Sequence, residues 1–359
     1  MNITAKTLNR TALLALSPFV GILIWLIASG MAVQLSGLDG AEFASSEPLA
    51  RTEALLSEAY VGLDAARETA IGTGESIKKQ LDLYNRTNAE MTAISKLAAA
   101  QAARPLAIYD AKITSKLGKP SATIDTDKLR AQLFYLSNDS FKSYAVKIKL
   151  KSGDAMKMVL GGSEIGQAQT TMQAVQSHKA AVGVNAGGFA DGGGKRYPLS
   201  NTIVDGKYVT GFEASYSDLF FVGMNDKNKL IGGKFASKDK LDALKPKYGA
   251  SFVPVLLRGG AAQSIPLKWQ VSPRRAPRTV IANYKDDQLL IIVTDGYNEA
   301  GSSGATLGEL QDLLKGYGAI DAYNLDGGGS SSLVFNGKLI NKPSDGSLRK
   351  LPTHFLFFK

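Results

Sequence analysis

The stretch that decides the fold of the C-terminal part is Tyr-Asn-Leu-Asp-Gly-Gly-Gly-Ser-Ser-Ser, residues 323–332. The first three residues have the composition of a short strand, and Asp326 follows them directly. Glycine allows the backbone to approach a ligand closely, and its amide groups can point at an anion. The stretch therefore predicts a strand that ends at a polar site.

Two other stretches share this arrangement. Residues 185–189, Asn-Ala-Gly-Gly-Phe, follow an apolar run, and Asp295 ends the apolar strand that comes after Arg278 and Thr279. Each stretch alone could be a tight turn in which Asn or Asp bonds its own backbone. Three such stretches at strand ends in one domain favour a shared site.

The remainder of residues 105–359 has the pattern of a domain rich in strands. The expected strands are 143–150, 180–184, 219–222, 252–257, 279–283 and 289–293, and the expected amphipathic helix is 305–316. Asn336-Gly337 lies between two short apolar runs, which is a strong hairpin signal. We therefore expect an α+β fold, with a mixed β-sheet and flanking helices.

The composition excludes several kinds of site. The chain has 359 residues, no cysteine and two histidines, His178 and His354. A disulfide framework, a thiolate zinc site and a cysteine nucleophile are therefore excluded, and little room is left for a Ser-His-Asp triad. The chemistry must depend on carboxylates, hydroxyls, amides and cations.

The charge favours anionic partners. Forty-two Lys and Arg residues against 32 Asp and Glu give a net charge of +10. Nucleic acid, a membrane surface and an acidic polymer all suit such a charge. No block of Arg and Lys interleaved with aromatic residues is present, so we expect no nucleic-acid partner. The alternative is a generally basic surface without a single partner.

The N-terminal region, residues 1–38, predicts a membrane anchor. Lys6 and Arg10 precede the largely apolar segment 13–33, which has about the 20 residues that a helix needs to cross a bilayer. The positive-inside rule places the N-terminus in the cytoplasm and the rest of the chain outside. The alternative is a cleavable signal peptide with its cleavage site near 28–30, which would make the protein secreted.

Residues 39–104 have the composition of a helical stalk. We expect one helix to begin near residue 47, an interruption at 72–74, and a second helix that ends at Arg104-Pro105. The second helix carries a short seam with coiled-coil spacing, made by Ile77, Leu81, Tyr84, Asn88 and Met91. The seam would allow self-association through the stalk, and a helical hairpin or spacer is the preferred alternative.

The three polar stretches lead to a known family. Together with residues 303–306 and 341–345, and in a consistent order over about 140–359, they resemble the phosphodiester glycosidase family. The membrane segment and the stalk lie outside the resemblance. The resemblance implies a hydrolase of sugar-1-phosphodiesters. Bacterial relatives are often encoded near exopolysaccharide or cell-wall genes, so it also implies a cell-surface glycopolymer as the substrate.

The resemblance also implies roles for single residues. Phosphate is a good leaving group, so the strong general acid of ordinary glycosidases is less necessary. Arg278 is the candidate phosphate clamp, because its guanidinium group matches phosphate oxygens. Asp326 and Asp295 are the candidates for nucleophile or general base, and the division of roles between them is open.

The candidate substrate-binding residues come from the same stretches. Asn185 and Asn324 are expected to orient sugar hydroxyls, and Thr279 to support Arg278. Backbone amides and hydroxyls of the glycine and serine residues are expected to bind phosphate or sugar. The other candidates are Gly187, Gly327, Gly328, Gly329, Ser330 and Ser331.

Two alternatives concern the chemistry itself. We expect no cofactor, although a divalent ion such as Ca²⁺ or Mg²⁺ could bind the Asp and Asn oxygens. The partner is expected to be a glycan phosphodiester or an anionic surface polymer. A non-catalytic protein that binds glycopolymer or assembles exopolysaccharide on the same fold is the rival interpretation.

Overall fold

The computed structural model describes residues 47–137, 140–216, 218–296 and 303–359. The predicted membrane segment 13–33 lies outside these ranges. Among the residues that are described, no helix is both long enough and apolar enough to cross a membrane. The chain divides into two units, residues 1–93 and 94–359.

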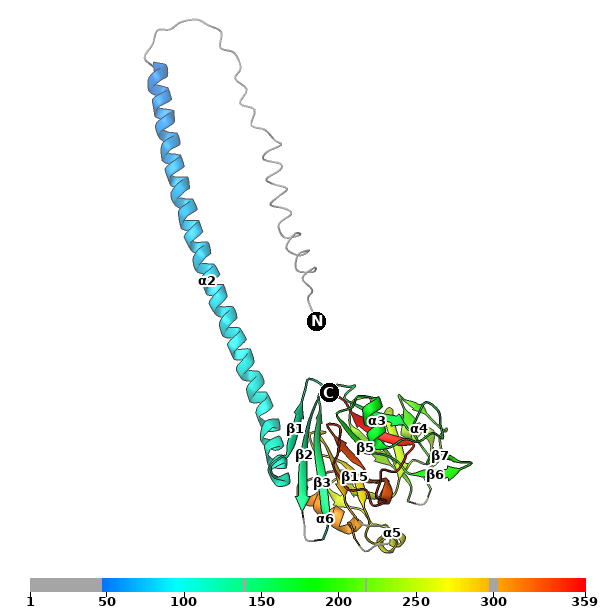
Figure 1. The fold of residues 1–359 in the computed structure, drawn as a ribbon. Coiled ribbons are helices and arrows are strands. Elements are labelled where there is room, and N and C mark those ends of the chain that lie inside the picture. The colour runs from blue at the N-terminus through cyan, green and yellow to red at the C-terminus, as the bar shows by residue number, and fades with distance from the viewer. Residues whose placement is uncertain (1–46, 138–139, 217, 297–302) are drawn as a thin grey trace. The chain divides into compact units, whose positions relative to one another are not determined.

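Helix α2, Glu47–Leu117, is one continuous helix of 71 residues (Figure 1). The expected interruption at 72–74 and the expected end at Arg104-Pro105 are therefore wrong. Each glycine costs a helix about 1 kcal/mol, which good helix formers on both sides can outweigh. Pro105 is tolerated because the helix is anchored beyond it, where Ile113 and Leu117 are buried in the core.

The largest sheet has eight strands in the order β1-β2-β3-β16-β15-β17-β13-β14. Short turns join β1 to β2, β13 to β14 and β15 to β16, and every pairing within the sheet is antiparallel. Its strands are β1 (Ala122–Asp125), β2 (Leu129–Ser137), β3 (Lys142–Leu150), β13 (Val255–Arg258), β14 (Ala261–Ala262), β15 (Arg278–Asn283), β16 (Leu289–Thr294) and β17 (Ala322–Leu325).

Two five-stranded sheets and one hairpin complete the β structure. One sheet has the order β11-β10-β12-β8-β9 and the other β19-β18-β5-β20-β4, and β6 pairs with β7. The strands are β4 (Met156–Leu160), β5 (Val182–Asn185), β6 (Phe189–Gly192), β7 (Lys195–Pro198), β8 (Ile203–Val204), β9 (Lys207–Tyr208), β10 (Phe220–Asn225), β11 (Leu230–Gly233), β12 (Pro246–Phe252), β18 (Leu333–Phe335), β19 (Lys338–Leu339) and β20 (Thr353–Phe357).

The α+β prediction is confirmed, and the expectation of a mixed sheet is corrected. All the strand pairs of these sheets are antiparallel, an arrangement in which consecutive strands can be joined by short turns, as β10 and β11 are. The expected strand 252–257 is divided between β12 and β13 at Pro254. Proline has no N–H to donate to a sheet ladder, so the ladder stops there.

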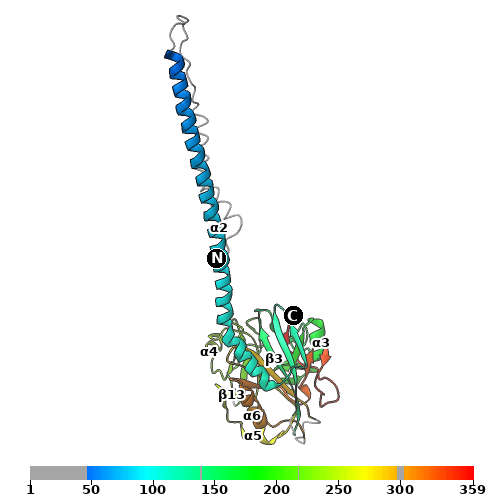
Figure 2. The same ribbon diagram turned by 90° about the vertical axis from the view of Figure 1, so that its left-hand side faces the viewer.

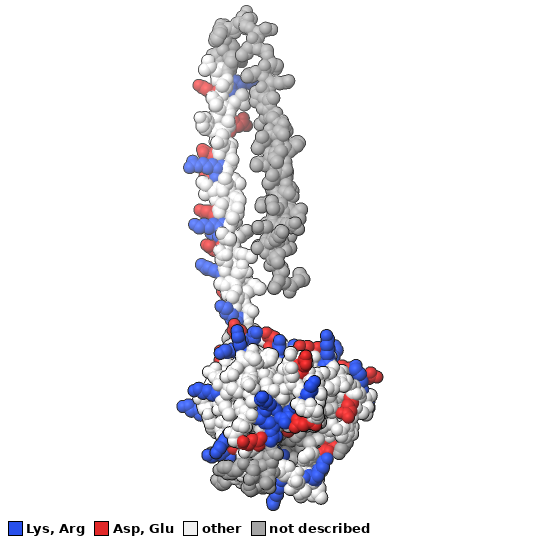
Figure 3. All heavy atoms as spheres, turned by 45° about the vertical axis from the view of Figure 1, so that its right-hand side comes forward, with Lys and Arg blue, Asp and Glu red and all other residues white. Residues whose placement is uncertain are grey.

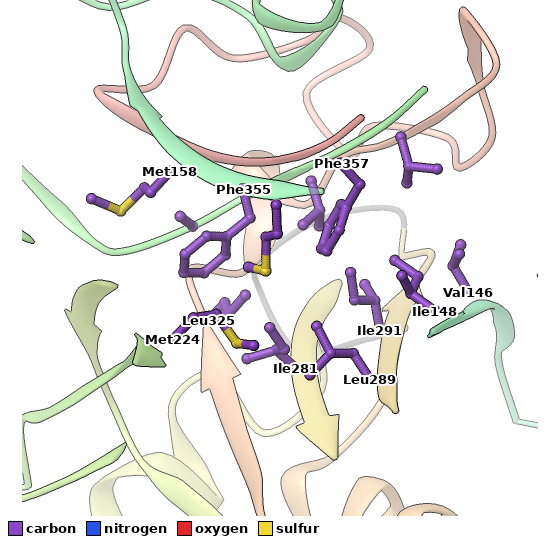
Figure 4. Packing of buried hydrophobic residues seen from close by; sticks show 14 of the residues in the cluster. Val146, Ile148, Met158, Met224, Ile281, Leu289, Ile291, Leu325, Phe355 and Phe357 are labelled. Carbon is purple, nitrogen blue, oxygen red and sulfur yellow. The ribbon is translucent and has the colours of Figure 1, made fainter. Parts of the chain in front are cut away.

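Strand β16 shows how the core is arranged around the large sheet. Leu289, Ile291 and Val293 face one hydrophobic cluster, while Leu290 and Ile292 face another. Figure 4 shows the first cluster, in which Phe355 and Phe357 of β20 lie over this face of the sheet. The sheet is therefore covered on both faces, which explains why β16 is apolar without alternation.

Helices cover the second face. Helix α6, Leu307–Tyr317, buries Leu307, Leu310 and Leu314 there, beside the last turns of α2. Thr306 and Glu309 form a capping box that fixes its start. Helices α3 (Thr171–Ser177), α4 (Lys238–Asp242) and α5 (Leu267–Val271) are short, and α5 lies next to α6 in both views (Figures 1 and 2).

The predicted hairpin at Asn336-Gly337 is confirmed. These two residues connect β18 and β19 with φ values of 48° and 75°. Positive φ at both central positions is the geometry of a type I′ turn, which matches the twist of the strands.

Candidate active site

The ends of three strands meet at one buried side chain, that of Asn185 at the end of β5. Its Nδ2 donates to the backbone oxygen of Asp326 at 2.6 Å. Its Oδ1 accepts from Thr279 Oγ1 at 2.9 Å and from the backbone N–H of Ser332 at 3.0 Å. The structure thus brings together the three stretches that the sequence singled out.

This geometry corrects two roles expected from the sequence. Asn185 is fully buried and bonded on both side-chain atoms, so it holds strands together rather than orienting sugar hydroxyls. Thr279 supports Asn185, not Arg278. The support for Arg278 comes from Thr294, whose Oγ1 accepts the backbone N–H of Arg278 at 2.9 Å.

A cavity of about 150 Å³ opens beside this junction. Its lining includes five of the predicted residues, and also Arg349, which the sequence analysis did not select. The lining residues are Phe252, Val253, Trp269, Pro273, Ala276, Arg278, Leu307, Asn324, Asp326, Gly327, Gly328 and Arg349. The cavity is therefore the candidate active site.

The guanidinium group of Arg278 is fixed at the cavity wall. Its Nε donates to the backbone oxygen of Ala305 at 3.3 Å, and its Nη2 donates to that of Pro273 at 2.8 Å. The planar guanidinium group of an arginine presents five N–H donors, a geometry that matches the oxygens of an anion. Because Arg278 is 6% exposed, its charge acts with little screening by water.

Asp326 lies directly after β17 and is held through its backbone. Its N–H donates to Ala186 O at 3.1 Å, and its Oδ1 accepts the N–H of Gly327 at 3.1 Å. The main chain thus sets the direction of this carboxylate. Asp326 is the one carboxylate among the described residues that line the cavity.

Asn324 contributes a buried acceptor to the same cavity. Its Nδ2 donates to Val253 O at 2.6 Å. Its Oδ1 is buried and has no hydrogen-bond partner among the described residues. A buried polar atom without a partner is costly, and a ligand hydroxyl in the cavity would satisfy it.

The glycine stretch acts differently from the sequence expectation. The amide of Gly327 bonds Asp326, and the amide of Gly328 donates to Pro277 O at 2.8 Å. These two amides are therefore already bonded within the protein. This corrects the expectation that they bind phosphate. Gly328 has φ 59°, which a glycine adopts without strain.

Gly329 leaves room for the side chains of two residues from a later segment. A Cβ on this residue would overlap the side chains of both Asp345 and Arg349. Arg349 Nη2 pairs with Asp345 at 2.7 Å, and its Nη1 donates to Ser330 Oγ at 3.3 Å. The glycine therefore lets Arg349 approach the turn η1, Gly328–Ser330.

Arg349 is the functional candidate that the sequence analysis missed. The only local signal is Asp345 four residues before it, outside any helix. Its place at the cavity becomes visible only when the 341–351 segment is folded back onto the glycine turn.

Three further predicted residues lie outside the cavity lining. Gly187 packs its backbone against Ala250 and Ser251, where a Cβ would not fit, so its role is in packing. Ser330 and Ser331 are both 1% exposed, and Ser331 Oγ has no hydrogen-bond partner within the described ranges. These serines belong to the support of the site.

Asp295 is also placed away from the cavity. Its Oδ2 accepts from Tyr144 OH at 2.7 Å, and its Oδ1 accepts the backbone N–H of Lys342 at 2.8 Å. Burial and the hydrogen bond to Asp295 raise the pKa of Tyr144. Both oxygens are thus engaged, and Asp295 fixes the segment that leads to Arg349.

His354 lies under the serines rather than in the cavity. Its Nδ1 is 3.1 Å from Thr171 Oγ1, which is in turn 2.6 Å from Ser332 Oγ. Its Nε2 lies 3.1 Å from Gln169 O. Burial lowers the pKa of His354 to about 4, so the ring is neutral near pH 7. The histidine has a structural role in this network.

Metal binding has no visible cluster to support it. In the described parts of the chain, no three acidic, cysteine or histidine side chains gather closely enough to hold an ion.

Comparison with known sequences finds a family model and several relatives. A family model described as phosphodiester glycosidase matches residues 178–358. An uncharacterised prophage-derived protein of Bacillus subtilis, YomE, is 27% identical over 184 residues, which cover 50% of this chain and 28% of that protein. Mouse N-acetylglucosamine-1-phosphodiester alpha-N-acetylglucosaminidase is 27% identical over 161 residues, 41% of this chain and 30% of the enzyme. The chain thus spans less than a third of the length of these relatives.

Solved structures share the fold. One is the catalytic domain of zebrafish N-acetylglucosamine-1-phosphodiester alpha-N-acetylglucosaminidase, auto-inhibited by its pro-peptide. It superimposes on this chain with a TM-score of 0.53 at 21% identity. The match covers 67% of this chain and 87% of that domain. A hypothetical protein from Synechocystis gives a TM-score of 0.53 at 15% identity, with 67% and 64% covered.

The residues matched by the family model, 178–358, make up half of the chain and include every residue that lines the cavity. Therefore the chain belongs to the phosphodiester glycosidase family.

Proposed function

We propose that this protein hydrolyses the glycosidic bond of sugar-1-phosphodiesters. Water adds to the anomeric carbon, the bond from that carbon to the phosphate oxygen breaks, and free sugar and a phosphomonoester leave. The observation that carries the proposal is the shared cavity of Asp326, Arg278 and Arg349. Curated relatives named for the same bond in N-acetylglucosamine-1-phosphodiesters support it.

The two arginines would bind the phosphate. Arg278 is fixed at the cavity wall by its bonds to two backbone oxygens, and Arg349 is held in place by Asp345 and Ser330. Charge-assisted bonds from guanidinium groups to phosphate are strong and directional. They would also stabilise the negative charge that collects on the phosphate as the glycosidic bond breaks.

Asp326 would act on the sugar side of the bond. As a carboxylate it can either activate water or attack the anomeric carbon, and it can stabilise positive charge on the sugar ring. A leaving phosphate needs little protonation, so one carboxylate in the cavity suffices for this mechanism. Asn324 Oδ1 would accept a hydrogen bond from a sugar hydroxyl, which satisfies its buried lone pairs.

We further propose that the reaction takes place outside the cytoplasm, on a cell-surface glycopolymer or exopolysaccharide. The support is the apolar segment 13–33 with Lys6 and Arg10 before it. The net charge of +10 would favour an anionic polymer over a neutral one.

The test is hydrolysis by the purified full chain. Methyl N-acetylglucosaminyl phosphate and UDP-N-acetylglucosamine are offered, and the free sugar is measured with and without a chelator. Asp326→Asn should lower kcat at least about a hundredfold, because general acid–base groups contribute that much. Asp127→Asn is the matched control, since Asp127 is an exposed carboxylate that does not line the cavity.

Three outcomes decide the matter. Sugar release by the wild type and by Asp127→Asn, but not by Asp326→Asn, supports the proposal. Equal release by both variants removes Asp326 from the chemistry. A folded wild type that releases no sugar but binds glycopolymer favours the rival interpretation of a non-catalytic binding protein.

A further inference from the structure

A second cavity lies beside the candidate active site. Its volume is about 730 Å³, against about 150 Å³ for the first. The loop 161–168, the β6–β7 hairpin and Lys350 line it. Neither the sequence analysis nor the proposed reaction gives this cavity a role.

The two cavities share a stretch of backbone. Arg349 lines the first cavity and Lys350, the next residue, lines the second. Consecutive Cα atoms are only about 3.8 Å apart. The pKa of Asp191 at the second cavity is lowered, chiefly by hydrogen bonding from Arg196 and also by the charge of Arg349. A ligand long enough to leave the small cavity could therefore continue into the large one.

Arg196 of the second cavity connects the β6–β7 hairpin to Lys350. Its Nε and Nη2 donate to the two oxygens of Asp191 at 2.7 and 2.9 Å, and its Nη1 donates to the backbone oxygen of Lys350. The guanidinium carbon lies 4.1 Å from the centroid of the Phe189 ring. The hairpin and the segment that carries Arg349 are thus joined before any ligand binds.

Two lysines that line the second cavity have no ion-pair partner among the described residues. Lys195 and Lys350 are exposed, and neither ammonium group makes an ion pair with a described residue. Asp191 is already paired with Arg196. Glu164 remains as the other carboxylate in the described lining, so two unpaired cations face one unpaired anion.

The visible face of the domain carries charges of both signs (Figure 3). Figure 3 shows Lys and Arg side chains mixed with Asp and Glu over the visible face of the domain, without one continuous basic area. Ile165 is 42% exposed at the cavity and offers an apolar surface for the carbon-bearing face of a sugar. Cations beside an apolar surface suit a sugar that carries a phosphate.

We propose that this cavity binds the next sugar-phosphate unit of a polymeric substrate. The natural substrate would then carry several phosphodiesters, one at Asp326 and its neighbour between Lys195 and Lys350. This inference rests on the proposed function, because it extends the same substrate from one cavity to the other. With both cavities occupied, the protein would bind a polymeric substrate more tightly than a small diester.

Binding to an inactive full chain tests the inference. In the Asp326→Asn background, the affinity is measured for methyl N-acetylglucosaminyl phosphate, with one phosphodiester, and for a synthetic N-acetylglucosamine oligomer with three. The oligomer should bind about tenfold more tightly, since hydrogen bonds to charged groups contribute that much. Lys195→Ala combined with Lys350→Ala should remove this preference, and Lys195→Arg combined with Lys350→Arg should keep it.

The control removes the same charge elsewhere. Lys149→Ala combined with Lys240→Ala changes two exposed lysines that do not line the cavity, and it should keep the preference for the oligomer. Equal affinities for the two probes, or a preference that survives in Lys195→Ala with Lys350→Ala, would overturn the inference. Because no turnover is needed, its failure can be told apart from failure of hydrolysis by the wild type.

Discussion

At the scale of single residues, the site depends on how closely chain segments approach one another. Gly329 brings the turn η1 against Arg349 and Asp345, which come from a segment some twenty residues later. A guanidinium group binds phosphate well only when it is held in the right direction. The position of Arg349 is therefore set by a residue that has no side chain.

Gly329→Ala should weaken substrate binding without unfolding the protein. The added methyl group overlaps the Arg349–Asp345 pair, which must move away from the turn. We expect kcat/KM for a small diester to fall at least about tenfold, mostly through KM, because misplacement of a binding group is costly. Steady-state kinetics of the purified variant measure this.

Gly308→Ala is the matched control for that experiment. Gly308 lies in α6, and a Cβ there meets no atom within 4 Å. Its kinetics should equal those of the wild type, and its stability should rise slightly because alanine is the better helix former. If Gly329→Ala also behaved like the wild type, Arg349 would not need its present position.

At the scale of elements, a buried hydrogen-bond network connects α3, β20 and the three serines at 330–332. Thr171 of α3 contacts both His354 of β20 and Ser332. Burial lowers the pKa of His354 to about 4, against an ordinary value of 6.5. Between these pH values the unfolded chain binds a proton that the folded chain does not, so stability falls as the pH falls through this window.

The expected loss is about 2 kcal/mol between pH 7 and pH 4.5. Urea unfolding of the wild type and of His354→Gln at both pH values measures it, because the glutamine variant lacks the titrating group. His178→Gln should retain the pH dependence of the wild type. The same dependence in all three proteins would mean that His354 does not cause it. A His354 imidazole resonance, assigned by its absence from the spectrum of His354→Gln, that titrates above pH 5 would lead to the same conclusion.

Helix α2 carries exposed apolar side chains along its length. Every seventh residue from Leu49 is apolar, namely Leu49, Leu56, Leu63, Ala70, Ile77, Tyr84, Met91 and Ala98. A coiled coil repeats apolar residues at two positions in every seven, and this series supplies one of the two along the helix. This series extends the short seam that the sequence analysis had noted, and it favours self-association of the protein.

We predict that the full chain forms an oligomer through this series. Leu56→Lys combined with Ile77→Lys should shift its mass in sedimentation equilibrium toward the monomer, because two charges would enter each seam. Leu83→Lys is the control, since Leu83 is exposed on α2 but lies off the series. A wild type that is monomeric at every concentration tested would contradict the prediction.

At the scale of the whole molecule, the sequence predicted what depends on local pattern. The three polar stretches, the Asn336-Gly337 hairpin and helix α6 follow from spacing and turn chemistry, and the structure contains them. Arg349 could not be found in this way, because only the folded chain brings it to Gly329. The roles expected of Asn185 and Gly327 differ from the structure for a related reason, because their hydrogen-bonding groups are already used. Asn185 bonds Asp326 O and Thr279 Oγ1, and the amide of Gly327 donates to the side chain of Asp326.

The apolar segment 13–33 predicts that the protein is attached to a membrane. The segment 13–33 contains no charged residue, and a Lys at the centre of such a span costs about 3 kcal/mol. Ile24→Lys combined with Leu26→Lys should therefore release into the supernatant, on alkaline carbonate extraction, a chain whose wild type stays with the membrane. Thr7→Lys combined with Asn9→Lys adds the same charge before the segment, where basic residues favour the cytoplasmic side, and should leave the chain in the membrane fraction. Wild-type protein found only in the supernatant, with an N-terminus near residue 31, would instead establish the cleaved signal peptide.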